Sequence, residues 1–451
     1  MASDKLWNAI THNNLKEIHQ ILSTGDIDLN KPYHGRSQTK GTFLQQACVS
    51  GSPVVVCALV KAGANVNACS IYKGHYYEFS VTALILAVIQ RKVDLVEKLL
   101  HQCGADVNVT NDEGLAPLHF ITEIIFSVGQ QAGPLEKYGR TFQHGAPHPV
   151  IDKKIANLLL TAGATVDLKN KDGQTPLHFA AMESRKGSVT VDILLQNGAR
   201  ADIQDGNGMT PLHNALEVRN EATVQCLLQH GATTNIQNRE KMTPLHLAVE
   251  KNAHATVQLL LQHGAKSNIQ NSRGMTPLHF AAEARNVTTA KILLQSHAKV
   301  DIPTHEGLTP LHVAINAHFA EMFKLLIQQI GSNNAAVVNH AANDGTTPLH
   351  AVIEQCKYTS LWMVDETATI VKLLIEKGAN LEVKKDHLTP LHLAVDGNLL
   401  NIVKLLVEAG ADIHAETPNT GLTPLDMAEH GGHKDIIDYL TARLESHGKK
   451  K

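Results

Sequence analysis

Histidine is the residue type in this chain with the most obvious capacity for chemistry, because imidazole can ligate metals and transfer protons near neutral pH. The 451 residues include 27 histidines. Eight of them end the motif Thr-Pro-Leu-His or Ala-Pro-Leu-His: His119, His178, His213, His246, His279, His312, His350 and His392. At the first turn of a helix, such a ring can bond the preceding threonine and a neighbouring backbone group. The motif therefore predicts a structural role for these eight histidines.

The other candidates for metal binding or catalysis are weak. His430 and His433 have a spacing that could ligate a metal, but they fall where a turn between two helices is expected. His144 and His148 have no cysteine near them to complete a zinc set. The sequence lacks phosphate-binding, serine-hydrolase and kinase motifs. We expect no metal, no cofactor and no enzymatic activity.

The elements that position the histidines can be predicted from one repeat, residues 243–275. Thr243 can cap a helix, and Pro244 can occupy its first position, where no backbone N–H is needed. A second apolar helix follows, and Gly264 supplies the left-handed residue that ends it. Residues 267–275 then return the chain to the next threonine. Each repeat therefore predicts two helices and a connecting finger.

This pattern resembles the ankyrin repeat along nearly the whole chain. The full motif begins at Thr175, Thr210, Thr243, Thr276, Thr309, Thr347 and Thr389, and weaker versions begin at Thr42, Thr82, Ala116 and Thr423. A period near 33 residues that carries T-P-L-H-x-A is the signature of that family. The resemblance implies an all-α repeat solenoid with short β-hairpin fingers. We expect about eleven motif-bearing repeats behind an N-terminal capping unit.

Departures from the period predict how the chain is organised. Two insertions are expected between the helices of a repeat, at 129–150 and at 356–367, and in solenoids insertions often mark a binding face. The expected segments are a capping helix pair (1–30), divergent repeats with long fingers (31–174), regular repeats (175–346), one repeat with an insertion (347–388), C-terminal repeats and cap (389–447) and a basic tail (448–451).

Aligning the repeats places acidic residues in one column, seven positions after the motif threonine, on the inner helix. We call this column the acidic ridge: Glu123, Glu217, Glu250, Glu283, Glu354 and Asp396. Stacked helices lie about 8–10 Å apart, so consecutive members predict evenly spaced negative charges. The alternative is ordinary solvated surface, neutralised by basic finger residues such as Arg239 and Arg273.

A second column, one residue before the motif threonine, is apolar. We call it the apolar rail: Met209, Met242, Met275 and Leu308. Methionine adapts to varied binding surfaces, so ridge and rail together predict a concave groove for a basic, partly apolar segment of a protein partner. The alternative is that the rail packs one finger against the next.

Aromatic residues are scarce in this chain, at 4% of its composition, yet they gather on two long N-terminal fingers. The candidate contact residues are Tyr33, Arg36, Tyr72, Tyr76, Tyr77 and Phe79. Tyrosine and arginine are enriched at interaction hot spots. The alternative is an aromatic cluster that folds a long finger onto itself.

Asparagine recurs at one position of the fingers, eight residues after a leucine, at Asn30, Asn67, Asn108, Asn235 and Asn268. Ankyrin repeats with this pattern are substrates of an asparaginyl hydroxylase, so the resemblance implies candidate hydroxylation sites. The alternative is that asparagine simply favours the tight turn of the finger.

Composition favours an intracellular protein that binds other proteins. A formal charge of -3 argues against a nucleic-acid or membrane-surface binder. Six scattered cysteines predict free thiols in a reducing compartment. The sequence predicts no signal peptide and no membrane span. We expect a monomer in the cytoplasm, with the nucleus as a second location.

The predicted function is a non-catalytic scaffold or adaptor that holds a protein partner. Three alternatives remain open. One is an effector that an intracellular bacterium or parasite delivers into a host cell. Another is an inhibitor that masks the nuclear-localisation segment of a transcription factor. The third is an enzyme whose site lies in one of the two insertions.

Overall fold

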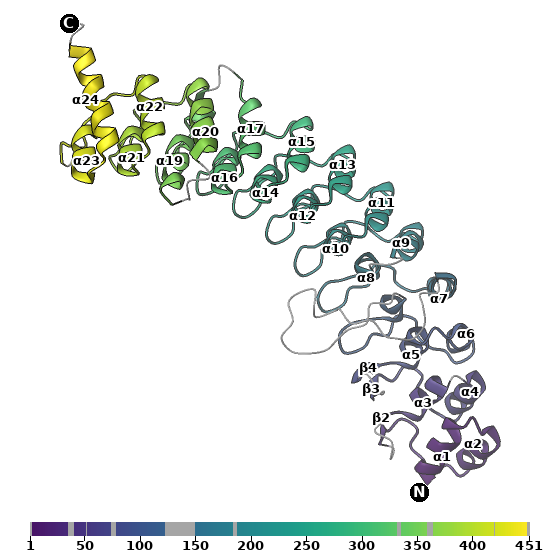
Figure 1. Ribbon diagram of the computed structural model, residues 1–451. Coiled ribbons are helices and arrows are strands. Elements are labelled where there is room, and N and C mark those ends of the chain that lie inside the picture. The colour runs from purple at the N-terminus through teal and green to yellow at the C-terminus, as the bar shows by residue number, and fades with distance from the viewer. Residues whose placement is uncertain are drawn as a thin grey trace. The chain divides into compact units, whose positions relative to one another are not determined.

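A computed structural model describes residues 2–34, 40–50, 52–73, 78–121, 149–183, 187–331, 335–358, 364–418 and 420–448. Contacts divide the chain into two compact units, Met1–Arg239 and Glu240–Lys451. Each unit is a series of antiparallel helix pairs (Figure 1). The predicted all-helical repeat architecture is confirmed. The division after residue 239 falls inside the block of regular repeats, where the sequence pattern predicts no boundary.

The helices of the first unit are α1 (Ala2–Thr11), α2 (Leu15–Leu22), α3 (Phe43–Ser50), α4 (Pro53–Lys61), α5 (Ala83–Ile89), α6 (Val93–His101), the 3-10 helix η1 (Pro117–Phe120), α7 (Pro149–Thr161), α8 (Pro176–Met182), α9 (Gly187–Gln196), α10 (Pro211–Glu217) and α11 (Glu221–Gln229). Helices α1 and α2 form the predicted N-terminal pair.

The helices of the second unit are α12 (Pro244–Glu250), α13 (His254–Gln262), α14 (Pro277–Glu283), α15 (Val287–Gln295), α16 (Pro310–Asn316), α17 (Ala320–Gln328), α18 (Ala335–Val338), α19 (Pro348–Tyr358), α20 (Val364–Glu376), α21 (Pro390–Asp396), α22 (Leu400–Glu408), α23 (Pro424–Gly431) and α24 (Lys434–Gly448). In a regular repeat the inner helix has seven residues and the outer helix nine.

The inner helix α12 begins and ends as its residues predict. Thr243 precedes the helix in an extended conformation, its hydroxyl oxygen accepts a hydrogen bond from the N–H of His246, and Pro244 is the first helical residue. Leu245 is fully buried against the neighbouring helices. After the outer helix α13, Gly264 adopts a φ of +83°, which is the left-handed conformation that favours glycine.

In several repeats the histidine of the motif joins the helix pair to the finger that follows it, whereas Nε2 of His350 is buried without such a bond. The backbone N–H of Thr243 donates to Nδ1 of His246 (3.1 Å), so Nε2 carries the proton and donates to the carbonyl of Met275 (3.1 Å). This confirms the structural role predicted for the motif histidines. The same bond from Nε2 to a finger carbonyl recurs in the pairs His178–Met209, His279–Leu308, His312–Thr346 and His392–Leu422.

The finger of a regular repeat is a single tight turn. The N–H of Asn271 donates to the carbonyl of Met275 (2.9 Å), and Gly274 has a φ of +77°. A Cβ atom on Gly274 would lie 2.6 Å from the backbone nitrogen of His305. That close approach allows the N–H of His305 to donate to the carbonyl of Arg273 (3.0 Å), which joins one finger to the next.

Among the described residues, strands occur only in the two long fingers of the first unit. Strands β1 (Tyr33–His34), β2 (Lys40–Gly41), β3 (Ser70–Lys73) and β4 (Glu78–Val81) form an antiparallel sheet in the order β1-β2-β3-β4. The described fingers of the regular repeats contain no strands. These fingers close within a single turn, which leaves too few residues for paired strands.

Helices α7, α19 and α20 include some residues of the two predicted insertions. Residues 122–148 lie outside the described residues, and helix α7 already begins at Pro149, within the insertion predicted at 129–150. In the second unit, α19 continues to Tyr358 and α20 begins at Val364. Most of the insertion predicted at 356–367 therefore lengthens these two helices, and residues 359–363 lie outside the described part of the chain.

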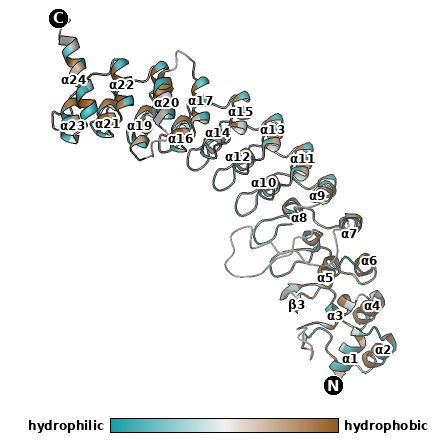
Figure 2. Ribbon diagram, viewed as in Figure 1, coloured by the Kyte–Doolittle hydropathy of each residue, from teal (hydrophilic) through white to brown (hydrophobic). Residues whose placement is uncertain are grey.

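The hydrophobic core of each unit lies between its helices. In Figure 2 the hydrophobic colour is concentrated on the helices rather than on the connecting fingers. In the second unit, Leu245, Val257 and Leu278 come from successive helices and are all fully buried. No described helix is both long and apolar enough to cross a bilayer.

Candidate protein-binding site

The acidic ridge occupies one structural position, the last residue of a seven-residue inner helix. In the first unit, Glu217 ends α10. In the second unit, Glu250 ends α12 and Glu283 ends α14, and these two helices pack against each other. Asp396 ends α21 in the same way. The shared position follows from the constant seven-residue length of the inner helix.

Glu250 and Glu283 are the members of the ridge that lie open to a partner. Both are exposed, and among the described residues neither side chain makes a hydrogen bond or an ion pair. Arg273, which the sequence suggests as a neutralising residue, has its guanidinium 5.8 Å from the centre of the Phe280 ring. The alternative, in which basic finger residues neutralise the acidic ridge, is therefore not seen at Glu250 and Glu283.

The rest of the ridge is in different surroundings. The carboxylate of Glu354 lies 2.8 Å from Nζ of Lys385, so its charge is neutralised within the chain. Glu217 is half-buried, whereas Asp396 is exposed. Glu123 lies outside the described residues. In the second unit the exposed ridge residues are thus Glu250, Glu283 and Asp396, and of these Glu250 and Glu283 lie on helices that pack against each other.

The side chains of the apolar rail are mostly enclosed by the fingers. Met242 is 4% exposed and Met275 is 6% exposed, and Met209 and Leu308 are half-buried. The Sδ atom of Met242 accepts a hydrogen bond from Nδ2 of Asn271 (3.3 Å) on the next finger. This burial favours the alternative in which the rail packs finger against finger. Contact with a partner through the rail stays a prediction.

The predicted aromatic contact surface is described only in part. The ring of Tyr33 lies 4.9 Å from the Trp7 ring and stacks on the Phe43 ring at 5.6 Å, and its hydroxyl bonds the carboxylate of Asp4. Tyr33 therefore packs the long finger onto α1 and α3. The backbones of Tyr72 and Phe79 face each other across β3 and β4, although their side chains are not described. The remaining candidates, Arg36, Tyr76 and Tyr77, lie outside the described residues.

The recurring finger asparagines bridge neighbouring repeats. Nδ2 of Asn268 donates to the carbonyl of His297 (3.2 Å), and its Oδ1 accepts the N–H of Lys299 (2.8 Å). Asn108 and Asn30 make the same pair of bonds to the repeats that follow them, and Asn67 accepts from the N–H of Asp106. This bridge explains the recurrence better than a preference for tight turns. Asn235 shares the position, and hydroxylation of Asn67, Asn108, Asn235 and Asn268 stays a prediction.

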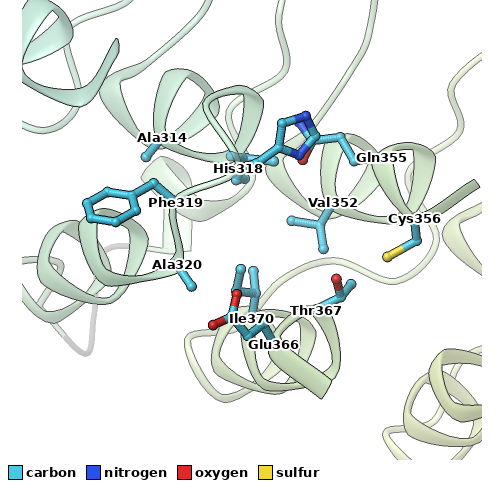
Figure 3. A pocket seen from close by; sticks show the side chains of 11 residues that line it. Ala314, His318, Phe319, Ala320, Val352, Gln355, Cys356, Glu366, Thr367 and Ile370 are labelled. Atoms are coloured by element: carbon cyan, nitrogen blue, oxygen red, sulfur yellow. The ribbon is translucent and has the colours of Figure 1, made fainter. Parts of the chain in front are cut away.

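A small cavity lies in the second unit between α16, α17, α19 and α20 (Figure 3). Its volume is about 30 Å³, and His318, Gln355 and Glu366 are among the polar residues that line it. Pockets for drug-sized ligands have volumes of roughly 300–1,000 Å³. This cavity therefore offers room for about one water molecule and does not indicate a small-molecule site.

The sequence matches a protein-family model described as ankyrin repeats (3 copies) over residues 6–111, 150–238, 219–304, 338–417 and 362–450. A second model, described as ankyrin repeat, matches residues 306–340. Together these matches cover most of the chain. Ankyrin repeat domains are typically protein-binding, and a catalytic domain is not evident among the matches.

Two curated proteins are similar to parts of this chain. The nuclear factor NF-kappa-B p105 subunit of Gallus gallus is 32% identical over 167 residues, which are 35% of this chain and 16% of that protein. The putative ankyrin repeat protein FPV031 of Fowlpox virus (strain NVSL) is 35% identical over 118 residues, which are 25% of this chain and 32% of that protein. The chain thus spans less than a third of the length of either relative.

A solved structure of the ankyrin repeat domain of Bcl-3, described as a unique member of the IkappaB protein family, is 27% identical to this chain. The alignment covers 55% of this chain and 98% of that chain, with a TM-score of 0.44. Such a score is too low to support an argument about function.

Proposed function

The chain belongs to the ankyrin-repeat family, and we propose on that basis that it is a non-catalytic scaffold that binds a basic segment of a protein partner. The proposed contact surface is the inner-helix face of the second unit, around Glu250 and Glu283. The observation that carries the proposal is that these two carboxylates are exposed at equivalent positions on packed helices and lack ion-pair partners among the described residues.

The position of these carboxylates argues that they do not serve the stability of their own helices. Each is the last residue of its helix. A negative charge there meets the negative end of the helix dipole, which is unfavourable by about 0.3–1 kcal/mol. A lysine or arginine of a partner would relieve that repulsion. Binding therefore explains an acidic residue at the end of the inner helix better than helix stability does.

The two carboxylates determine which charges, and at what spacing, the partner segment should carry. A segment with positive charges spaced to match two stacked helices, about 8–10 Å apart, could pair with both carboxylates. Exposed ion pairs contribute little to affinity but speed association and select among partners. Salt should therefore slow the association of the partner more than it speeds dissociation.

One specific version of this proposal is an inhibitor of a transcription factor, and one relative is named as a nuclear factor subunit. A nuclear-localisation segment is a short basic stretch, so a transcription factor masked at such a segment would present suitable charges. The match covers only 16% of that relative. An effector delivered into a host cell is the other alternative that the sequence leaves open, and it could use the same surface.

Selection of random peptides displayed on phage tests the proposal without knowledge of the natural partner. The wild-type protein is expected to enrich peptides that contain lysine or arginine together with apolar residues. A double variant, Glu250→Lys with Glu283→Lys, should lose that enrichment. Enrichment of basic peptides by both proteins would show that the two carboxylates are not the binding surface.

A matched control is available on the outer helices of the same unit. Glu376 is the last residue of α20 and Glu408 the last residue of α22; both are exposed, and Glu408 differs from Glu250 and Glu283 in lying 3.9 Å from the Arg443 guanidinium. Changing both to lysine alters the net charge of the unit by the same amount as the Glu250→Lys, Glu283→Lys double variant does. The changed residues again lie at helix ends. This control should select the same basic peptides as the wild type, so a non-specific effect of net charge can be recognised.

A further inference from the structure

We propose that Asp192, Cys226 and His230 form a zinc site that joins two outer helices of the first unit. Asp192 lies on α9, Cys226 lies on α11, and His230 is the residue that ends α11. The ligand atoms of these three side chains all lie within 4.8 Å of one another. This site does not depend on the binding function proposed for the second unit.

The distance between two of the donors fits zinc. The Nε2 atom of His230 lies 3.4 Å from Oδ1 of Asp192. Typical Zn–N and Zn–O bonds in a tetrahedral site place a nitrogen and an oxygen ligand about 3.4 Å apart. The Sγ atom of Cys226 lies 3.9 Å from the Nδ1 atom of His230. Nδ1 is not the nitrogen that faces Asp192, but the ligand atoms of the three side chains all lie within 4.8 Å of one another.

Neighbouring groups orient the histidine and the aspartate as they do at protein metal sites. Nδ1 of His230 lies 3.0 Å from the backbone carbonyl of Cys226 and donates to it, which leaves the lone pair on Nε2 free. Nε2 of Gln196 donates to Oδ2 of Asp192 (2.8 Å), which leaves Oδ1 directed to the histidine. Ligating histidines characteristically donate their second ring nitrogen to a carbonyl or carboxylate.

The mixture of donors selects the metal. One sulfur, one imidazole nitrogen and one carboxylate oxygen form a set that Zn²⁺ accepts, whereas Ca²⁺ and Mg²⁺ prefer oxygen ligands only. Three protein ligands leave a fourth position for water. The side chains of His230 and Asp192 are 31% and 42% exposed, so an ion can reach the site from solvent.

Binding must displace the proton of the Cys226 thiol. Burial and the nearby Asp192 carboxylate raise the pKa of this thiol to about 11. Zn²⁺ therefore takes the sulfur electron pair as the S–H bond breaks, and the proton passes to solvent. No atom changes oxidation state in this step. One proton is released for each ion bound, so affinity should increase with pH.

The sequence alone did not indicate this site. Cys226 and His230 are four residues apart, which places them on one face of α11, but two ligands do not define a zinc set. The third ligand comes from the preceding repeat, 34 residues earlier in the chain. Only the packing of α9 against α11 brings it near.

Cobalt is a suitable probe, because a cobalt–thiolate bond gives an intense near-ultraviolet absorption band that nitrogen and oxygen ligands do not give. The full chain, freed of any histidine tag and treated with a chelator, is titrated with Co²⁺. We expect one equivalent to produce the band, and Cys226→Ser to abolish it. Cys57 and Cys103 have their sulfurs 3.2 Å apart and are a second possible source of the band, so the titrations are made in a Cys57→Ser background, which should keep the band until Cys226→Ser is added.

A second measurement does not depend on the cysteine. Addition of Zn²⁺ should raise the thermal unfolding midpoint of the wild type, and His230→Gln should remove that rise. His263→Gln is the matched control, because His263 ends α13 with the same bond from Nδ1 to a backbone carbonyl, 2.9 Å from Leu259, but has no cysteine beside it. A band that survives Cys226→Ser in the Cys57→Ser background, or an equal rise in the His230→Gln variant, would overturn the proposal.

Discussion

The Nε2 atom of His246 lies 3.1 Å from the carbonyl oxygen of Met275, so the histidine at the start of one inner helix is bonded to the finger that leads into the next. Its Nδ1 atom accepts the N–H of Thr243 at the start of its own helix. A single neutral ring therefore satisfies one buried donor and one buried acceptor. This pair of bonds explains why histidine recurs in the motif without a catalytic or metal-binding role.

Two departures from histidine in this chain support that explanation. In the repeat that begins at Thr42, Gln45 accepts the N–H of Thr42 (2.8 Å) and donates to the carbonyl of Val81 (2.9 Å), which repeats both bonds. In the repeat that begins at Thr423, Asp426 accepts the N–H of Thr423 (2.8 Å). A carboxylate can only accept, so Asp426 reproduces the bond within its own helix and not the bond to a following finger.

Replacing His246 tests this role directly. In His246→Leu the buried N–H of Thr243 loses its partner, at a cost of about 1–3 kcal/mol, and the carbonyl of Met275 keeps only the N–H of Asn271. Gln45 shows that glutamine can make both bonds, so His246→Gln should lose much less stability. Urea denaturation of the two variants checks this. Equal losses would mean that packing of the ring, rather than hydrogen bonding, is what matters.

The stability of the fold should depend on pH in a way that the motif histidines determine. Burial lowers the pKa of five of them to about 4, below the 6.5 of an unfolded chain: His119, His178, His246, His279 and His312. Because the folded pKa is depressed, the full stability is present above pH 6.5. It is lost as the pH falls towards 4, because the unfolded state then binds more protons.

The measurement is the thermal unfolding midpoint between pH 7.5 and 4. A triple variant with His246, His279 and His312 changed to glutamine should show a shallower decline than the wild type, because glutamine does not titrate. If the unfolding midpoint declines equally steeply in both proteins, titratable groups other than these three histidines cause the pH dependence.

The asparagine bridge predicts a local loss of stability. In Asn268→Ala the carbonyl of His297 and the N–H of Lys299 lose a partner at a half-buried position. We expect a loss of about 1 kcal/mol, measured by urea denaturation. The control is Gln262→Ala, at an exposed position on the outer helix α13, which should cost little. If the two variants lose the same stability, the bridge does not hold the repeats together.

Mass spectrometry tests the predicted hydroxylation of the same finger residues. Peptides that contain Asn67, Asn108, Asn235 or Asn268 should gain the mass of one oxygen in cells that have an asparaginyl hydroxylase. Unmodified peptides from such cells would contradict the prediction. The asparagine side chain bonds the next repeat at Asn108 and Asn268, so the enzyme would have to reach a finger that is locally opened.

The repeat sequence predicted the fold well because each repeat carries its own local signals. Thr243, Pro244 and Gly264 set the ends of two helices without reference to the rest of the chain, and the structure follows them. The insertion predicted at 356–367 has no such signals. Residues 356–358 and 364–367 have no motif of their own, yet they continue helices α19 and α20, because helix propagation needs no special residue.

The candidate site depends more on packing than on local signals. The column alignment predicts one shared position on the inner helix for Glu250 and Glu283, and both residues end their helices because the repeats have equal length. It could not predict that Met242 and Met275 are enclosed by fingers, or that Lys385 neutralises Glu354, because both contacts join residues about 30 positions apart. Asp192 and His230 were missed for the same reason.

The measurement that tests the central claim most directly is affinity capture of the natural partner from a lysate of the source organism. The wild type is compared with the variant in which Glu250 and Glu283 are lysine, and with the control in which Glu376 and Glu408 are lysine. The account predicts a discrete protein with a basic segment that the wild type and the control retain and the first variant loses, at unchanged thermal stability. Equal retention of that protein by all three would contradict a binding role for Glu250 and Glu283.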